Sequence, residues 1–150
     1  MRIVGASLAV LVMVAAVAEP ARAAPETEAL QVLSRWAAAF SASDVDGIVT
    51  LYAPDALFLG TGSRTVVSDP AGIRRYFEEA LLTRRPRGAA VTSPSVRQLS
   101  PDAVLITGLD EVSGVNDGTP FSSPGRITFV IAKRDAGWQI VHFHRSAMPR

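Results

Sequence analysis

The sequence predicts an α+β fold in which helices come first and a curved, mostly antiparallel sheet follows. Apolar residues recur at helical spacing before Pro86, whereas β-branched and aromatic residues fill the segments after it. Short polar turns separate those later segments, and strands joined by short turns pair with antiparallel neighbours. Helices grouped ahead of a meandering sheet are typical of the α+β class.

Residues 1–23 are expected to be a secretory signal peptide and not part of this fold. Arg2 precedes an apolar run over residues 3–18, and Ala21 and Ala23 stand where a signal peptidase requires small residues. The alternative, a membrane anchor, is disfavoured because the run has roughly 16 residues and a bilayer needs about 20. We therefore expect an exported protein, periplasmic or secreted, without membrane association after cleavage.

The rest of the chain, residues 24–150, has the length of a single domain. A domain of this size buries about two thirds of its unfolded surface without covalent crosslinks. The chain has no cysteine, which excludes disulfide bonds and a lipid attached to cysteine.

Charge is balanced in this domain. Of 15 basic and 14 acidic residues in the chain, 13 of each lie in residues 24–150, so nucleic acid is not an expected partner. The local exception is the stretch TRRPRG, which contains Arg84, Arg85 and Arg87. We expect it to be a solvated loop, with a phosphate or partner contact as the alternative.

Three helices are expected in the first half. The first runs from Glu26 to about Ser41–Ser43. Asp44 and Asp69 stand at N-cap positions for a short second helix, residues 45–52, and for a third helix that ends before Pro86. The apolar stripe of the first helix is Leu30, Leu33, Trp36, Ala37 and Phe40.

Four strands are expected afterwards, over residues 91–99, 103–115, 121–133 and 138–147. Alternation in the last of them places Val141, Phe143 and Arg145 on one face. His142, His144 and Ser146 then point to the other face. Because both faces carry bulky groups, we expect the sheet to be covered on both sides, most simply by a homodimer.

The two histidines of the chain, His142 and His144, do not make a metal site by themselves. Zinc sites take three or four protein ligands, and only a carboxylate such as Asp110 or Glu111 could add a third. We expect no metal and no cofactor. The chain also lacks the Gly-x-Ser-x-Gly setting of serine hydrolases and the glycine loop that binds phosphate. General acid–base chemistry remains open.

Two arginines lie within predicted strands. Arg126 opens the run RITFVIA and Arg145 ends the last strand. A planar guanidinium suits two-point binding of a carboxylate. The alternative is a structural ion pair with Asp110, Glu111 or Asp44.

Four stretches resemble one known family. GWQIVHFHRSAMP is similar to the closing strand of the association (hub) domain of calcium/calmodulin-dependent protein kinase II, and YFEEALL to its third helix. SDVDGIVTLYAPDALF resembles its second helix and next strand, and GRITFVIAKRDAGW its penultimate hairpin. The order holds across residues 24–150, and the related bacterial proteins belong to the nuclear transport factor 2-like, or SnoaL-like, superfamily.

The resemblance implies a cone-shaped fold with a pocket between helices and concave sheet, and dimers or larger rings formed through the sheet. It implies carboxylate-binding arginines at Arg126 and Arg145, and we expect Trp36, Tyr52 and Phe143 to line the same pocket. The chain departs from the family at three positions. Leu109 replaces an arginine, Ala38 an acid and Ile73 a histidine.

Three functions follow as hypotheses. The first is an exported, self-associating domain that holds a small organic anion in the pocket. The second is an enzyme of the ketosteroid isomerase or polyketide cyclase type, with Asp44, Tyr52, Asp110 or His144 moving protons. The third is an assembly protein without a ligand. Since fold leaves function open, the catalytic residues are not assigned.

Overall fold

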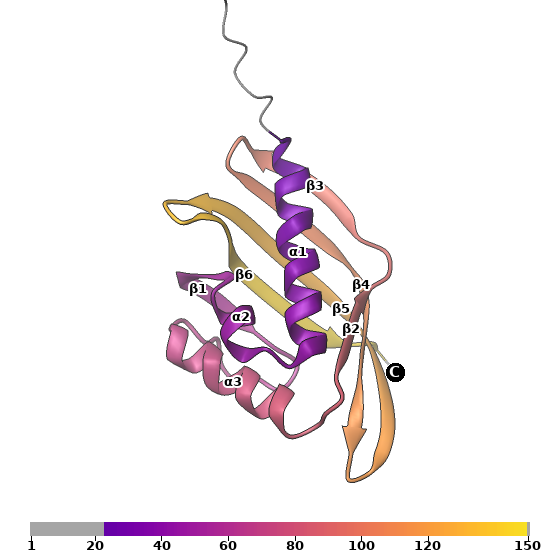
Figure 1. Ribbon diagram of the computed structural model, residues 1–150. Helices are drawn as coiled ribbons and strands as arrows, with labels where there is room; N and C mark the ends of the chain where they lie inside the picture. The colour runs from indigo at the N-terminus through magenta and orange to yellow at the C-terminus, as the bar shows by residue number, and fades with distance from the viewer. Residues whose placement is uncertain (1–22, 150) are drawn as a thin grey trace, which may run out of the picture.

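The computed structural model describes residues 23–149, so the predicted signal peptide lies outside the described residues apart from Ala23. Within them, three helices cover one face of a curved sheet of six strands, and the predicted α+β class is confirmed (Figure 1). The helices are α1 Pro25–Ala42, α2 Val45–Val49 and α3 Pro70–Leu82. The strands are β1 Tyr52–Leu59, β2 Gly88–Val91, β3 Ser95–Ser100, β4 Ala103–Asn116, β5 Thr119–Arg134 and β6 Gly137–Ala147.

Both predicted N-caps are confirmed. The carboxylates of Asp44 and Asp69 accept hydrogen bonds from the backbone N–H of Gly47 (2.9 Å) and Gly72 (2.8 Å), which would otherwise lack a partner. Helix α2 ends at Val49, however, and not at Tyr52 as predicted. Tyr52 pairs with Ile140 of β6 instead, so strand pairing overrides the helical pattern there.

The buried face of α1 differs in part from the predicted stripe. Leu30 is 39% exposed, whereas Ala29 and Val32 on the adjoining face are fully buried. The centre of the stripe is confirmed, because Leu33, Trp36 and Phe40 are buried against the sheet. Among the described helices, none is both long and apolar enough to cross a membrane.

The sheet order is β1-β6-β5-β4-β2, with β3 also paired to β4. The β1–β6 pair is parallel, and the β2–β4, β3–β4, β4–β5 and β5–β6 pairs are antiparallel. The single strand predicted over residues 91–99 is wrong, because β2 and β3 are separate strands that pair with different parts of β4. The connection between them passes close to β4, since a Cβ at Gly108 would collide with the Ser93 carbonyl oxygen. Pro94 in this connection has no N–H to give to the ladder.

Alternation along the strands separates two faces of the sheet. We call the face beneath the helices the inner face and the opposite one the outer face. Phe143 and Arg145 of β6 are buried on the inner face, whereas His142 and His144 lie half-exposed on the outer face, as predicted. The inner face therefore carries the side chains that can form an enclosed site.

Candidate ligand-binding site

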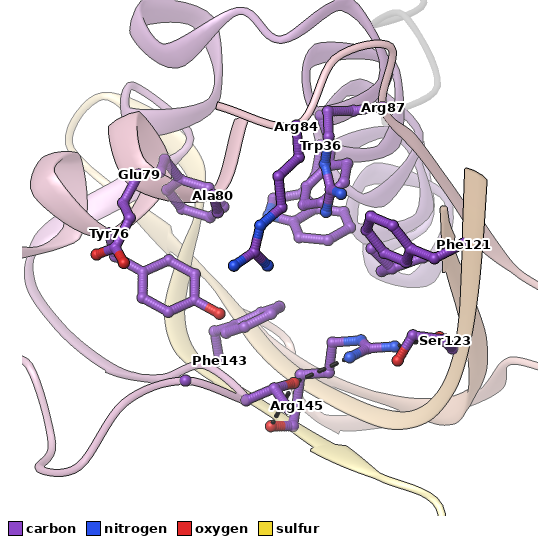
Figure 2. A pocket seen from close by; sticks show the side chains of 15 residues that line it. Trp36, Tyr76, Glu79, Ala80, Arg84, Arg87, Phe121, Ser123, Phe143 and Arg145 are labelled. Atoms are coloured by element: carbon purple, nitrogen blue, oxygen red, sulfur yellow. Dashed lines mark hydrogen bonds between the residues drawn. The ribbon is translucent and has the colours of Figure 1, made fainter. Parts of the chain in front are cut away.

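A cavity of about 330 Å³ lies between the inner face and helices α1 and α3 (Figure 2). Its walls also include Thr61 and Gly62 from the connection after β1, and Arg84 and Arg87 from the connection after α3. The volume is near the lower end of the range of about 300–1,000 Å³ for small-molecule sites. The site therefore suits a ligand of modest size.

Aromatic side chains dominate the walls. The chain has six phenylalanines, two tryptophans and two tyrosines, and six of these ten residues line the cavity. Trp36 and Phe143, both predicted to line a pocket, are packed into the floor with 1% and 2% exposure. The six are Trp36, Phe40, Tyr76, Phe77, Phe121 and Phe143.

Tyr52, which was also expected in the pocket, lies behind this wall. Its hydroxyl accepts a hydrogen bond from Trp36 Nε1 at 3.0 Å. Burial raises the pKa of Tyr52 well above its ordinary value, so the hydroxyl stays neutral. Tyr52 thus holds the Trp36 ring in place and does not reach the cavity.

Arg145 lies in the cavity wall and is part of a buried ion pair. Its Nε donates to Asp110 Oδ2 at 2.6 Å, and the two side chains are 8% and 1% exposed. Nη2 donates to the Ser123 carbonyl oxygen (2.7 Å) and Nη1 to Thr61 Oγ1 (2.9 Å). The structural ion pair that the sequence left open for Arg145 is therefore present, and its positive charge is offset.

Gly125 makes this ion pair possible. Arg145 is on β6 and Asp110 on β4, so the pair has to cross β5, where Gly125 stands opposite Asp110. A Cβ at Gly125 would lie 2.6 Å from both Arg145 Nη2 and Asp110 Oδ1. The missing side chain leaves the passage through which the guanidinium reaches its carboxylate.

Arg87 is in a different electrostatic situation. Its guanidinium packs between the rings of Phe40 and Phe121, 5.1 and 5.2 Å from their centroids. Its Nε and Nη1 atoms are buried and have no hydrogen-bond partner among the described residues. Burial first, and then repulsion from Arg84, lowers the pKa of Arg87. The fold therefore holds a positive charge beside the cavity that no carboxylate of the described residues offsets.

Arg84 belongs to the same wall, and Figure 2 shows its side chain extending into the cavity. The expectation that TRRPRG is a solvated loop is wrong for Arg87, which is partly buried, whereas Arg84 and Arg85 are exposed. Gly114 was an available sequence signal, since a glycine inside a strand often marks a close approach. A Cβ at Gly114 would collide with Arg87 Nη1.

Arg126 does not reach the cavity, and the expectation that it shares a pocket with Arg145 is wrong. Its neighbours along β5, Gly125 and Ile127, are buried on the inner face, so alternation sends Arg126 to the exposed outer face. There it pairs in register with Leu109 and Ser146.

The residues considered for proton transfer or metal binding do not converge on the cavity. Asp44 caps α2 and Asp110 binds Arg145, whereas His142 and His144 lie on the outer face, opposite to Asp110. Among the described residues, no cluster of three or more histidine, aspartate and glutamate side chains could hold a metal ion.

Tyr76 and Glu79 of α3 do line the cavity, although the sequence did not single them out. Burial, as the main cause, raises the pKa of the Tyr76 phenol. Tyr76 is therefore a neutral hydroxyl at the cavity wall, and Glu79 is an exposed carboxylate near it.

Comparison with known proteins places this geometry in a family. Residues 29–150 match the family described as the SnoaL-like domain. A structure from Xanthomonas campestris, named as a calcium/calmodulin-dependent protein kinase II association domain, is 31% identical, with 82% of this chain and 87% of that chain covered and a TM-score of 0.75. This match confirms the resemblance seen in the sequence.

Two more distant structures share the fold. An NTF2-like superfamily protein from Salmonella enterica is 19% identical, with a TM-score of 0.75 over 84% of this chain and 92% of that chain. A protein named as a dehydratase of the NTF2-like family, from Streptomyces avermitilis, is 15% identical, with a TM-score of 0.74 over 83% and 96%. At these identities the similarity establishes the cone-shaped NTF2-like fold and no activity.

Proposed function

The chain belongs to the SnoaL-like domain family, and we propose that this member binds a small organic anion, a carboxylate, in the aromatic cavity. The observation that carries the proposal is the guanidinium of Arg87, which is held beside the cavity without a carboxylate partner. Desolvating a charge without a partner costs free energy, and an anion bound next to it would offset that cost.

The charge balance of the walls supports the same proposal. Arg84 and Arg87 contribute two positive charges, Arg145 is neutralised by Asp110, and Glu79 contributes one negative charge. The cavity is therefore positive by about one unit at neutral pH, when arginine is protonated. A planar guanidinium recognises a carboxylate by parallel hydrogen bonds, which a halide or an alcohol cannot reproduce.

The arginines have separate roles in this proposal. Arg84 and Arg87 contact the anion, while Arg145 connects three parts of the wall through Thr61, Asp110 and Ser123. Three of the guanidinium hydrogen-bond donors of Arg145 are already used. It therefore acts as a positioning residue.

The proposal is tested by calorimetric titration of the purified protein with sodium acetate, succinate and benzoate. Arg87→Met keeps a long apolar stem against the phenylalanines and removes the charge, so it should weaken carboxylate binding about tenfold or more. Arg126→Met is the matched control, because it removes the same group from the outer face. Equal affinities for the two variants, or no binding of any carboxylate to the wild type, would refute the proposal.

Self-association through the outer face is the second part of the proposal. Leu57 and Leu109 are 47% and 45% exposed there, and the Xanthomonas structure is named as an association domain. A second copy would cover these side chains. Light scattering should find a dimer or larger assembly for the wild type and a smaller species for Leu57→Glu. A monomeric wild type at high concentration would count against it.

Export remains a prediction from residues 1–23. If it is correct, the protein recovered from the expressing cells begins close to Ala24 and is found outside the cytoplasm. Intact mass measurement after cell fractionation tests this. A full-length protein that stays in the cytoplasm would contradict it.

The alternative function is an enzyme that moves protons in the same cavity. Tyr76 favours it, because its neutral hydroxyl can donate a hydrogen bond to a substrate carbonyl. The proton acceptors considered from the sequence all lie elsewhere, which leaves Glu79 as the carboxylate of the cavity wall. A turnover screen on cyclic ketones would support this alternative if Tyr76→Phe and Glu79→Gln both abolished a wild-type activity.

A further inference from the structure

We infer that the anion is a small aromatic monocarboxylate, whose flat ring lies between Tyr76 and Phe121 and whose carboxylate meets Arg84 and Arg87. This inference rests on the proposed anion binding and adds the chemical class of the ligand. Four observations carry it: the two rings, the stacking of Arg87, the net charge and the cavity volume.

Tyr76 and Phe121 stand on opposite walls, and Figure 2 shows them on either side of the cavity with Phe143 between them. Both are partly exposed, unlike the buried floor residue Phe143. Aromatic pairs prefer offset stacking or edge-to-face contact at centroid distances of about 4.5–7 Å. A flat ring in this space meets an aromatic partner on each side, whereas an aliphatic chain gains only buried area.

The stacking of Arg87 determines where the carboxylate lies. The rings of Phe40 and Phe121 face its guanidinium at 5.1 and 5.2 Å, so an anion has to approach the nitrogens along the edge of the guanidinium plane. Phe121 thereby contacts both Arg87 and the proposed ring of the ligand. The carboxylate must consequently sit close to that ring, as in a benzoate or an arylacetate.

Net charge and size set the remaining limits. With Arg145 neutralised by Asp110, the other charged side chains of the wall leave about one uncompensated positive charge, which one carboxylate balances. A cavity of about 330 Å³ accommodates one ring or a fused pair and excludes larger polycyclic ligands.

The decisive measurement is calorimetric titration with sodium benzoate, cyclohexanecarboxylate, acetate and phthalate. Benzoate and cyclohexanecarboxylate have nearly the same size and charge and differ in the flat ring. We expect benzoate to bind about tenfold more tightly than cyclohexanecarboxylate and more tightly than phthalate or acetate. If cyclohexanecarboxylate or acetate binds as well as benzoate, the inference fails while anion binding stands. If none binds, the proposed function fails with it.

Variants at Tyr76 locate the ring contact. Tyr76→Phe keeps the ring and should retain the preference for benzoate, whereas Tyr76→Leu removes the ring and should reduce it to about twofold or less. An unchanged preference in Tyr76→Leu would overturn the placement. Should that variant fail to fold, NMR on the wild type decides: intermolecular NOEs should join the ring protons of Tyr76 to those of bound benzoate, and their absence would overturn the placement.

Discussion

Arg145 and Arg126 have similar positions in the sequence, each within a strand of apolar residues, yet they lie on opposite faces of the sheet. Arg145 is 8% exposed on the inner face and paired with Asp110, whereas Arg126 is exposed on the outer face and makes no ion pair among the described residues. The face of the strand on which an arginine stands, and not the residue type, therefore decides its role in this sheet.

The cavity wall also contains two kinds of arginine. Arg145 has partners for three nitrogens, while Arg87 has stacking partners and two buried nitrogens without a hydrogen bond. A buried ion pair is weak evidence for added stability, but it fixes geometry where it connects several elements. The pair of Arg145 with Asp110 joins β4 to β6 across β5, and so shapes the cavity in which Arg87 stands.

The largest effect should come from removing the carboxylate of the inner face. Asp110→Ala leaves Arg145 buried without its counter-ion, which costs about 3–5 kcal/mol of the free energy of unfolding. Glu111→Ala is the matched control, because Glu111 is the next residue and is exposed, and it should change stability by about 0.5 kcal/mol or less. Urea unfolding measures both. Similar losses of unfolding free energy in the two variants would show that the buried carboxylate of Asp110 contributes no more than the exposed one of Glu111.

A smaller effect is expected when the passage between the partners is filled. Gly125→Ala places a methyl group 2.6 Å from both Arg145 Nη2 and Asp110 Oδ1, and the displaced ion pair should cost about 1–3 kcal/mol. At Gly62 the nearest atom to an added Cβ is 3.9 Å away, so Gly62→Ala should be tolerated. Thermal unfolding of both variants tests this. A Gly125→Ala variant as stable as Gly62→Ala would mean that the pair moves aside freely.

Local chemistry explains which parts of the fold were predictable. Asp44 and Asp69 predict where helices begin, because each carboxylate accepts a hydrogen bond from the backbone N–H three residues later in the sequence. The end of α2 was mispredicted because it depends on a contact 88 residues later, where Tyr52 meets Ile140. Propensity within a short window carries no information on such a pairing.

The candidate site was less predictable, since Thr61, Asp110, Ser123 and Arg145 come together only when the sheet forms. The placement of Arg126 is different, because the alternation of Ile127, Phe129 and Ile131 already indicated its outward direction. Gly114 and Gly125 lie within predicted strands, and a glycine there often indicates that another group packs closely against the backbone. In this protein those groups are the side chains of Arg87 and Arg145.

The smallest effect concerns the outer face and its histidines. Burial first, and then the charge of His144, lowers the pKa of His142 below its ordinary value of 6.5. The unfolded chain then binds a proton more readily than the folded one, so the free energy of unfolding should fall as the pH drops below about 6.5. His142→Gln removes this dependence, and its stability should change less than that of the wild type between about pH 7.5 and about pH 5.5.

Urea unfolding of both proteins at the two pH values measures this difference. The measurement at the higher pH is the control, because His142 is neutral there and the two proteins differ only by the substitution. Identical pH dependence in wild type and His142→Gln would show that folding does not lower the pKa of His142. If a second copy covers this face, His142 becomes more buried in the assembly than in the single chain, and desolvation lowers its pKa further. The pH dependence should then grow with protein concentration, which links the proton affinity of the outer face to its proposed contact.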